Sequence, residues 1–309
     1  MIEEVPDLQP GKGQVLVTVK AAAANFPDVL MLQNKYQHRP TLPYTPGYEF
    51  AGLVKAIGEG VTKINVGDAG VAIVRSGGFA EEALVEADRF WRMPEGVDFI
   101  DAAAFPLAYG TSYHALKDRG CLKQDETLLV LGASGGVGIA AVQIGKLMGA
   151  KVIACASSDD KLKLCRTHGA DETINYNTGN LREAIKALTG DDGVDVILDP
   201  VGGDYAEAAV RSMAWYGRYL VVGFTGGSIP RITTNLVLLK GCSIIGVAWD
   251  TYSRKNPEGG ARNVAELFDW IKLGRLRPVV SKTYRLSEAA CALEDIMYRR
   301  VKGKVIVTP

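Results

Sequence analysis

The sequence predicts an α/β protein in which a doubly wound parallel sheet is joined to a second, β-rich domain. Three features carry this expectation. Strand and helix patterns alternate from residue 126 to Trp249, a glycine-rich turn at 132–138 joins the first of these strands to its helix, and the first hundred residues hold short strand patterns separated by turns. The length of 309 residues fits two domains rather than one ordinary core.

The first domain is expected to contain short strands, because apolar residues alternate with polar ones between turn residues. These strands are predicted at residues 14–20, 51–57, 70–74 and 78–85. A proline-punctuated loop covers residues 40–47. Residues 98–120 have a helical pattern that Pro106 interrupts, since proline lacks the N–H that a helix interior needs, and this stretch is expected to bridge the two domains.

Six strand patterns follow, most of them separated by a helix pattern, as in a doubly wound sheet. The strands are predicted at residues 127–131, 151–157, 172–176, 194–203, 218–224 and 242–249, with helices at 139–148, 159–168, 181–188 and 205–213. Helices at 264–273 and 288–300 and strands at 282–286 and 304–308 close the chain, and this last segment resembles the first domain in texture. We therefore predict one domain over residues 1–105 and 250–309, and a second over residues 106–249.

The turn at residues 132–138 has the sequence features of an anion-binding site. Glycines at 132, 135, 136 and 138 follow an aliphatic strand pattern and open a helix pattern. Without a Cβ, the backbone can approach a phosphate closely. The first N–H groups of the helix and the positive end of its dipole then meet the anion. The spacing G-x-x-G-x-x-G in this context predicts a site for the pyrophosphate of a dinucleotide.

The end of the second predicted strand bears on which dinucleotide is bound. Ser157 and Ser158 follow this strand, and Lys161 lies one helical turn further on. Hydroxyl and basic groups suit the 2′-phosphate of NADP(H), whereas a carboxylate binds the free 2′-OH of NAD. We therefore predict NADP(H). Two alternatives stay open: Ser157 is only the cap of the helix beginning at Asp159, with Lys161 solvated, or Asp159 or Asp160 faces the ribose of NAD.

Composition narrows the function classes further. Lys+Arg and Asp+Glu both number 35, which disfavours a general nucleic-acid or membrane-surface binder. The five cysteines are scattered without a C-x-x-C pair, as in a protein of a reducing compartment. No export signal and no apolar run of membrane-spanning length are visible, so a cytoplasmic location is expected.

Several motifs together resemble the zinc-independent quinone oxidoreductases of the medium-chain dehydrogenase/reductase superfamily. They are NFPDVLMLQNKYQ (25–37), PYTPGYEFAGLV (43–54), the glycine turn and VGG (201–203). The stretches at 158–164, 215–227 and 235–241 look closest to the quinone oxidoreductase-like protein 2 group. The resemblance covers essentially the whole chain and implies a Rossmann domain plus a GroES-like catalytic domain. Because relatives begin with a strand hairpin ahead of EEVPDLQPGKG, we expect this hairpin to be missing here.

The resemblance also bears on metal binding. In the zinc enzymes of this superfamily a cysteine and a histidine hold the catalytic metal, and the matching positions here are Asn25 and Tyr48. An amide and a phenol do not replace thiolate and imidazole ligands, so no zinc is expected. The three histidines have no ligand spacing and receive no role.

Roles for individual residues follow from the resemblance. It implies a substrate cleft between the domains, over the nicotinamide, with matching positions at Asn25, Tyr36, Tyr44, Tyr48, Phe224, Trp249 and Tyr252. Asn25 is expected to hydrogen-bond a carbonyl or the nicotinamide ribose, and Tyr48 is a candidate proton donor. The alternatives are that Asn25 only satisfies loop backbone and that the Tyr and Trp residues only pack. The residues expected to bind the cofactor are Thr111, Gly132, Ser134, Gly135, Gly136, Val137, Gly138, Ser157, Lys161, Tyr176, Val201, Gly223 and Phe224. Arg299 or Lys304 either touches the cofactor or is a solvated charge.

Without zinc, an already electrophilic acceptor is the expected substrate, because an alcohol must be ionised before it donates hydride. We therefore predict an NADPH-dependent quinone reductase. The resemblance also implies a homodimer, in which the strand at 242–247 lies at the sheet edge and pairs with the same strand of a second copy. An enone or enoyl-thioester reductase and a non-catalytic NADPH-binding sensor are the alternatives. The natural acceptor, the physiological role and the number of electrons transferred per step do not follow from the sequence.

Overall fold

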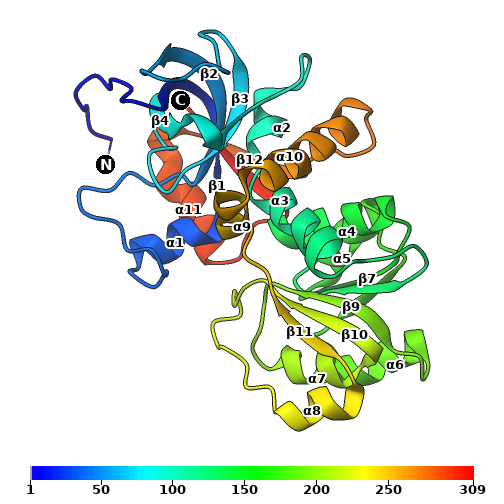
Figure 1. Ribbon diagram of the computed structural model, residues 1–309. Coiled ribbons are helices and arrows are strands. Elements are labelled where there is room, and N and C mark those ends of the chain that lie inside the picture. The colour runs from blue at the N-terminus through cyan, green and yellow to red at the C-terminus, as the bar shows by residue number, and fades with distance from the viewer. Residues whose placement is uncertain (1) are drawn as a thin grey trace. The chain divides into compact units, whose positions relative to one another are not determined.

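The computed structural model describes residues 2–309 and divides them into two compact units (Figure 1). The first unit runs up to Leu107 and resumes at Ser253–Pro309, and the second is Ala108–Tyr252. The chain thus leaves the first unit after Leu107, where the sequence placed the boundary at 105. It returns after Tyr252, where the sequence placed the boundary at 249.

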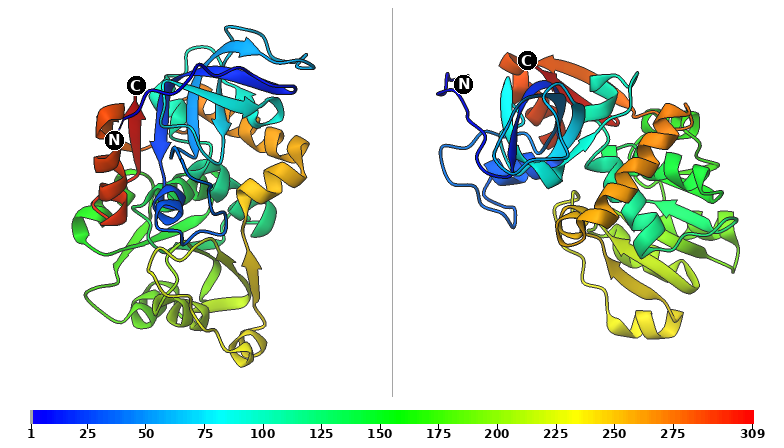
Figure 2. Two further views of the ribbon diagram at one scale, coloured as in Figure 1. Left: turned by 90° about the vertical axis from the view of Figure 1, so that its left-hand side faces the viewer. Right: turned by 45° about the horizontal axis from the view of Figure 1, so that its top comes forward.

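The first unit contains a seven-stranded sheet in the order β12-β13-β1-β2-β3-β5, with β4 also paired to β1. Its strands are β1 Gln14–Ala24, β2 Glu49–Ile57, β3 Ala69–Ile73, β4 Glu82–Glu86, β5 Phe90–Arg92, β12 Val280–Arg285 and β13 Lys304–Thr308. Strand β1 pairs antiparallel with β13, so the end of the chain joins the sheet of the first hundred residues (Figure 2). The core on this sheet is closed by α11 (Ala289–Met297), which buries Ala292 and Ile296.

The structure corrects two expectations in this unit. The predicted strand at 78–85 begins only at Glu82. Before it, the backbone N–H groups of Gly78 and Phe79 donate to Gly47 and Pro46 instead of to a strand. Helix α1 (Phe26–Leu32) was not predicted. It begins after Asn25, its N-cap, because Pro27 suits the first turn of a helix and because the Asp28 carboxylate accepts the Asn25 backbone N–H at 2.9 Å.

The second unit contains a parallel sheet of six strands, which confirms the predicted doubly wound fold. The strands are β6 Thr127–Val130, β7 Lys151–Ala156, β8 Glu172–Asn175, β9 Val194–Asp199, β10 Met213–Val221 and β11 Ser243–Gly246. Their order, β11-β10-β9-β6-β7-β8, reverses direction between β6 and β9. In sheets of this kind, ligands bind at the carboxyl ends of the strands beside such a reversal.

Helices alternate with these strands along the chain (Figure 1). They are α4 Gly136–Leu147, α5 Asp159–Thr167, α6 Leu181–Thr189, α7 Tyr205–Arg211 and α8 Thr234–Lys240. Strand β10 starts five residues before the predicted 218, with an irregular pairing between Met213 and Arg218 that leaves Tyr216 at a φ of 60°. Among the described residues, no helix combines the length and the apolar character needed to cross a membrane.

The predicted helical stretch at 98–120 is divided into separate pieces, as Pro106 required. Helix α2 (Phe99–Ala103) ends before the proline, and α3 (Ala108–Tyr113) begins after it and continues as the π-helix His114–Arg119. The remaining helices are α9 Trp249–Lys255 and α10 Pro257–Lys272.

Candidate functional site

The turn after β6 contains several glycines, and the structural constraint on the residue type differs from one position to the next. Gly132 has a φ of 60°, and a Cβ there would lie 2.7 Å from Val201 Cγ2. A Cβ at Gly138 would lie 2.3 Å from the carbonyl oxygen of Gly132, so this glycine lets α4 pack on the turn. A Cβ at Gly135 would meet nothing closer than 3.5 Å. No packing contact therefore requires a glycine at 135.

Gly135 is the N-cap of α4, a helix of twelve residues. The first N–H groups of a helix have no acceptor within the helix, and they carry its positive dipole end. The backbone at Gly135, where a Cβ would make no contact closer than 3.5 Å, lies at this helix terminus, where an anion is stabilised. The predicted pyrophosphate-binding residues Ser134, Gly135, Gly136 and Val137 all lie here, so the turn fits a dinucleotide.

Ser112 fixes the first turn of α4 from the neighbouring helix. Its Oγ lies 2.8 Å from the Val137 carbonyl oxygen and 3.0 Å from that of Ala108, and it is buried. The predicted cofactor residue Thr111 precedes Ser112 on α3 and is 9 % exposed. Sequence analysis did not identify Ser112, because a single serine in an apolar helix gives no signal of its partner.

Asp199, at the end of β9, holds two loops together. Its carboxylate accepts the N–H of Val201 at 2.7 Å and of Gly202 at 2.8 Å, as well as the hydroxyl of Tyr219. Its backbone oxygen accepts the N–H of Gly223 at 3.3 Å. Burial raises the pKa of Asp199, and these hydrogen bonds oppose that rise. Asp199 was not among the residues predicted from the sequence, although an acid at the end of a buried strand pattern is a visible signal for such a role.

These two loops contain three predicted cofactor residues, Val201, Gly223 and Phe224. The backbone N–H of Gly226 donates to the Val201 carbonyl at 2.8 Å, which joins the loops a second time. Gly202 has a φ of 68°, and a Cβ there would lie 2.8 Å from Phe224 Cδ1. The Phe224 ring is 37 % exposed. The structure thus brings Val201, Gly223 and Phe224 together at the carboxyl ends of β9 and β10.

The hydroxyl and basic groups after β7 are also brought together. Lys161 Nζ donates to Ser157 Oγ at 3.3 Å. The cap of α5 is Ser158, whose Oγ accepts the Lys161 backbone N–H, so the interpretation of Ser157 as the cap is wrong. The Asp159 carboxylate accepts Asn175 Nδ2 at 2.8 Å.

Tyr176 follows β8 beside this pair. Its ring centroid lies 4.4 Å from that of Tyr205. Asn177, the next residue, donates through Nδ2 to the Ser157 carbonyl at 3.0 Å. The ends of β7 and β8 are therefore joined around Ser157, and three residues that we expected to bind the cofactor, Ser157, Lys161 and Tyr176, lie there.

The first unit contains a buried polar cluster made by Asn25, Glu49 and Lys304. Lys304 Nζ donates to Glu49 Oε1 at 2.7 Å and to Asn25 Oδ1. Asn25 Nδ2 donates to Glu49 Oε1 at 2.9 Å and to the Ala23 carbonyl at 3.0 Å. Lys304 is 3 % exposed, so its interpretation as a solvated charge is wrong.

This geometry restricts what Asn25 offers to a ligand. An amide nitrogen has two hydrogens, and both are used within the protein. The Oδ1 atom accepts from Lys304 and has a second lone pair. In this arrangement Asn25 Nδ2 has no hydrogen left to donate to a carbonyl, whereas Oδ1 is an acceptor.

Asp28 borders the same cluster. Its carboxylate accepts the backbone N–H groups of Asn25 at 2.9 Å and of Gly47 at 3.1 Å. Burial raises the pKa of Asp28 to about 7, although both hydrogen bonds and the charge of Lys304 lower it. Across residues 2–309, no three His, Cys, Asp or Glu side chains gather into a group that could hold a metal ion.

The predicted aromatic residues of the first unit differ in burial. Tyr48 is 3 % exposed, whereas Tyr36 and Tyr44 are half-buried. The Tyr44 hydroxyl lies 3.6 Å from Met31 Sδ, and burial raises the pKa of Tyr44. Tyr44 is therefore a poorer acid than a free phenol.

Trp249 and Tyr252, in the second unit, pack on α3 and the π-helix. A Cβ at Gly110 would lie 2.5 Å from Trp249 Nε1, so the indole occupies the space above this glycine. The Tyr252 ring stacks on His114 with centroids 4.2 Å apart. His114 in turn lies 2.7 Å from an Asp118 carboxylate oxygen. His114, to which sequence analysis gave no role, thus orients Tyr252.

Two family models match the chain. The alcohol dehydrogenase GroES-like domain matches residues 11–95, and the family described as zinc-binding dehydrogenase matches residues 136–266. These segments lie in the first unit and mainly in the second unit, respectively.

Known proteins resemble the chain over nearly its whole length. Quinone oxidoreductase-like protein 2 of Bos taurus is 38 % identical over 309 residues, which cover 100 % of this chain and 88 % of the relative. The Escherichia coli quinone oxidoreductase complexed with NADPH is 28 % identical, with a TM-score of 0.92 over 100 % of this chain and 95 % of that one. The CurK enoyl reductase is 25 % identical, with a TM-score of 0.88 over 99 % of this chain and 94 % of that one.

Proposed function

Because this chain belongs to the quinone oxidoreductase family of the medium-chain dehydrogenase/reductase superfamily, we propose that it reduces quinones with NADPH and without zinc. The observation that carries the choice of cofactor is the contact between Lys161 Nζ and Ser157 Oγ at 3.3 Å. An ammonium and a hydroxyl at the end of the second strand suit a 2′-phosphate. The relative from Escherichia coli, solved as a complex with NADPH, supports the same assignment.

The residues proposed to hold the cofactor form three groups in the second unit. The first turn of α4 holds the pyrophosphate, and Ser157, Lys161 and Tyr176 surround the adenosine phosphate. Val201, Gly223 and Phe224, with Thr111, lie at the nicotinamide end. When bound, NADPH supplies a hydride from its nicotinamide ring.

A quinone acceptor is compatible with Asn25 and Tyr48, the residues at the positions where the zinc enzymes of the superfamily have metal ligands. A quinone is electrophilic without a Lewis acid, so positioning and a proton source are sufficient. The amide of Asn25 and the phenol of Tyr48 are poor zinc ligands. We propose that Asn25 Oδ1 accepts a hydroxyl of the nicotinamide ribose, and that Tyr36, Tyr44 and Tyr252, which are half-buried, contribute aromatic surface for a planar acceptor. Tyr48 and Trp249 are 3 % and 2 % exposed, so in this structure they pack rather than offer open surface.

Reduction of an enone or enoyl thioester is the second candidate, and the similarity to the CurK enoyl reductase favours it. The two functions differ in the acceptor and share the cofactor site. The third candidate is a non-catalytic sensor, which would bind NADPH without reducing any acceptor.

An acceptor and cofactor panel on the purified protein tests the proposal. Oxidation of NADPH and of NADH is followed at equal concentrations with a naphthoquinone, a crotonyl thioester or no acceptor. We expect turnover with NADPH and the naphthoquinone at a kcat/KM well above that for the thioester. The reverse order would establish the enoyl-reductase alternative. NADPH binding without turnover on either acceptor would establish the sensor.

Two further properties belong to the proposal. The edge strand β11 is proposed to pair with the same strand of a second copy. A cytoplasmic location is supported by the five free cysteines, of which Cys121 and Cys291 are exposed, because exposed thiols persist in a reducing compartment.

A further inference from the structure

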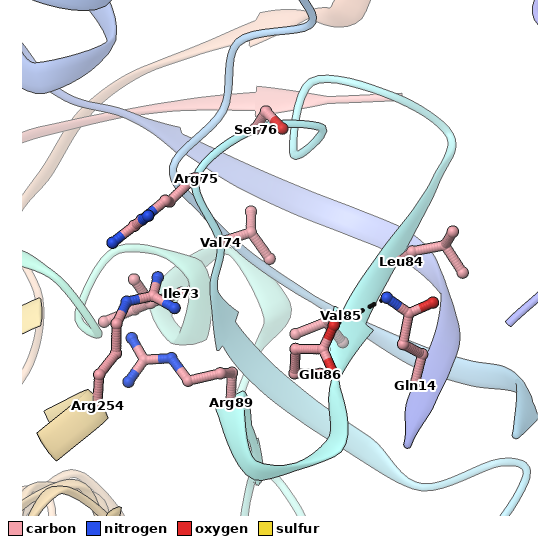
Figure 3. A pocket seen from close by; sticks show the side chains of 10 residues that line it. All are labelled: Gln14, Ile73, Val74, Arg75, Ser76, Leu84, Val85, Glu86, Arg89 and Arg254. Atoms are coloured by element: carbon pink, nitrogen blue, oxygen red, sulfur yellow. Dashed lines mark hydrogen bonds between the residues drawn. The ribbon is translucent and has the colours of Figure 1, made fainter. Parts of the chain in front are cut away.

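A cavity of about 220 Å³ in the first unit is lined by three arginines, Arg75, Arg89 and Arg254. Arg75 follows β3, Arg89 ends the short 3₁₀ turn Ala87–Arg89, and Arg254 lies on α9. Figure 3 shows their side chains extending toward one another at one end of the cavity. The full lining also includes Gln14, Ile73, Val74, Ser76, Leu84, Val85 and Glu86.

The charge of this lining is unbalanced. Glu86 is the one acidic residue among the ten, and its Oε1 accepts Gln14 Nε2 at 2.8 Å. Figure 3 shows this pair away from the three guanidinium groups. Because arginine stays ionised at every physiological pH, the three groups repel one another. The repulsion is screened least at Arg89, which is 4 % exposed.

Arg89 is also held in a fixed orientation. Its Nη1 donates to Ser253 Oγ at 2.7 Å, and its guanidinium carbon lies 5.1 Å from the centroid of the Trp91 ring. Arg75 is exposed and Arg254 is half-buried. The cavity therefore has one rigid cation in its floor and two cations at its rim, which is an arrangement suited to an anion with several oxygen atoms.

The size and the remaining walls restrict the ligand further. The volume of about 220 Å³ equals about seven water molecules and lies below the roughly 300–1,000 Å³ of pockets for drug-sized ligands. Apolar side chains of β3 and β4 form another part of the wall: Ile73, Leu84 and Val85, with Val74 beside them. A tetrahedral phosphate presents oxygens to several guanidinium groups at once, and a small apolar substituent matches this wall.

We propose that this cavity is a binding site for a phosphate group, either as inorganic phosphate or as the phosphomonoester of a small molecule. It involves none of the residues that we assign to the cofactor or to the acceptor. The site is thus a second ligand site in the first unit, and its function does not depend on the identity of the acceptor.

Calorimetric titration of the full chain with inorganic phosphate and with butyl phosphate tests this site. We expect a saturable site in the wild type that is weakened about tenfold by Arg75→Ala or by Arg254→Ala, since each removes charge-assisted hydrogen bonds from the cavity. Both residues lie at the rim, and thermal unfolding checks that the variants remain folded. Tighter binding of butyl phosphate identifies a phosphomonoester as the ligand, and equal binding identifies inorganic phosphate.

Two control variants make the result specific. Arg262→Ala removes an exposed arginine of α10 outside the cavity, and Lys161→Ala removes the cation beside Ser157. We expect phosphate affinity to stay unchanged in both. The proposal is overturned if the wild type shows no saturable phosphate binding, if Arg262→Ala weakens binding as much as the rim variants do, or if Lys161→Ala alone abolishes it.

Discussion

At the scale of single residues, the cofactor preference depends on one lysine and one hydroxyl. Lys161 Nζ lies 3.3 Å from Ser157 Oγ, close enough for both to contact one phosphate. Lys161→Ala should raise the KM for NADPH by about tenfold or more, since a hydrogen bond to a charged group contributes roughly 1.5–3 kcal/mol. The KM for NADH, which has no 2′-phosphate, should change little. Steady-state kinetics with both cofactors measure this.

Lys163→Ala is the matched control for that measurement. Lys163 lies on the same helix and is exposed. Its removal should leave both KM values unchanged. If Lys161→Ala affected NADPH and NADH equally, the phosphate assignment of this residue would be wrong.

A second prediction at this scale concerns pH. Burial raises the pKa of Asp28 from 3.8 to about 7. Between these values the folded protein holds a proton that the unfolded chain has lost, so its stability should fall as the pH rises toward 7. Asp28→Asn should remove this dependence, which amounts to at most about 1.4 kcal/mol per pH unit. Urea unfolding of both proteins between pH 5 and 8 measures the difference in slope.

Asp295→Asn is the control for the pH prediction. Hydrogen bonds from Tyr284 and Arg300 lower the pKa of Asp295 to about 2, so its contribution to stability is lost only as the pH falls below the range tested. This variant should run parallel to the wild type from pH 5 to 8. Parallel curves for Asp28→Asn as well would contradict the raised pKa.

At the scale of elements, two glycines near the start of α4 differ in role: Gly138 is required for packing, and Gly135 is proposed to leave room for the ligand. An alanine Cβ at 138 would lie 2.3 Å from the Gly132 carbonyl oxygen, whereas one at 135 would meet nothing within 3.4 Å. Gly138→Ala should therefore destabilise the fold by about 2 kcal/mol or more. Gly135→Ala should leave the free energy of unfolding nearly unchanged but weaken NADPH binding, because its methyl group would face the pyrophosphate. Urea unfolding and NADPH titration distinguish the two effects, and equal destabilisation by both changes would refute this division of roles.

The elements also show what sequence patterns predict and what they miss. The strands of the parallel sheet were predictable because aliphatic runs such as 127–131 are buried on both faces. Helix α1 was missed because its seven residues are too few for a clear helical period. The cluster of Asn25, Glu49 and Lys304 was also missed, since Lys304 is 279 positions from Asn25 along the chain. Local patterns contain no information about partners so distant, which only the pairing of β1 with β13 brings together.

At the scale of the whole molecule, the proposed assembly depends on an unpaired sheet edge. Within residues 2–309, strand β11 is the first in its sheet and pairs with β10 alone. Its four residues are Ser243–Gly246, and Ile244 is 41 % exposed. A strand edge with free N–H and C=O groups and an exposed apolar side chain is a template for pairing with another strand. Its pairing with a second copy would satisfy these groups and cover Ile244.

Ile244→Lys should therefore convert a dimer into a monomer, because a lysine on each copy would place two ammonium groups in the shared sheet. Size-exclusion chromatography with light scattering measures the mass directly. Leu273→Lys is the control, since Leu273 is 68 % exposed and lies just after α10 in the other unit. It should leave the mass unchanged. A wild-type monomer, or a dimer that persists in Ile244→Lys, would show that β11 is not the interface. NADPH binding by the monomeric variant would show that the cofactor site is complete within one chain.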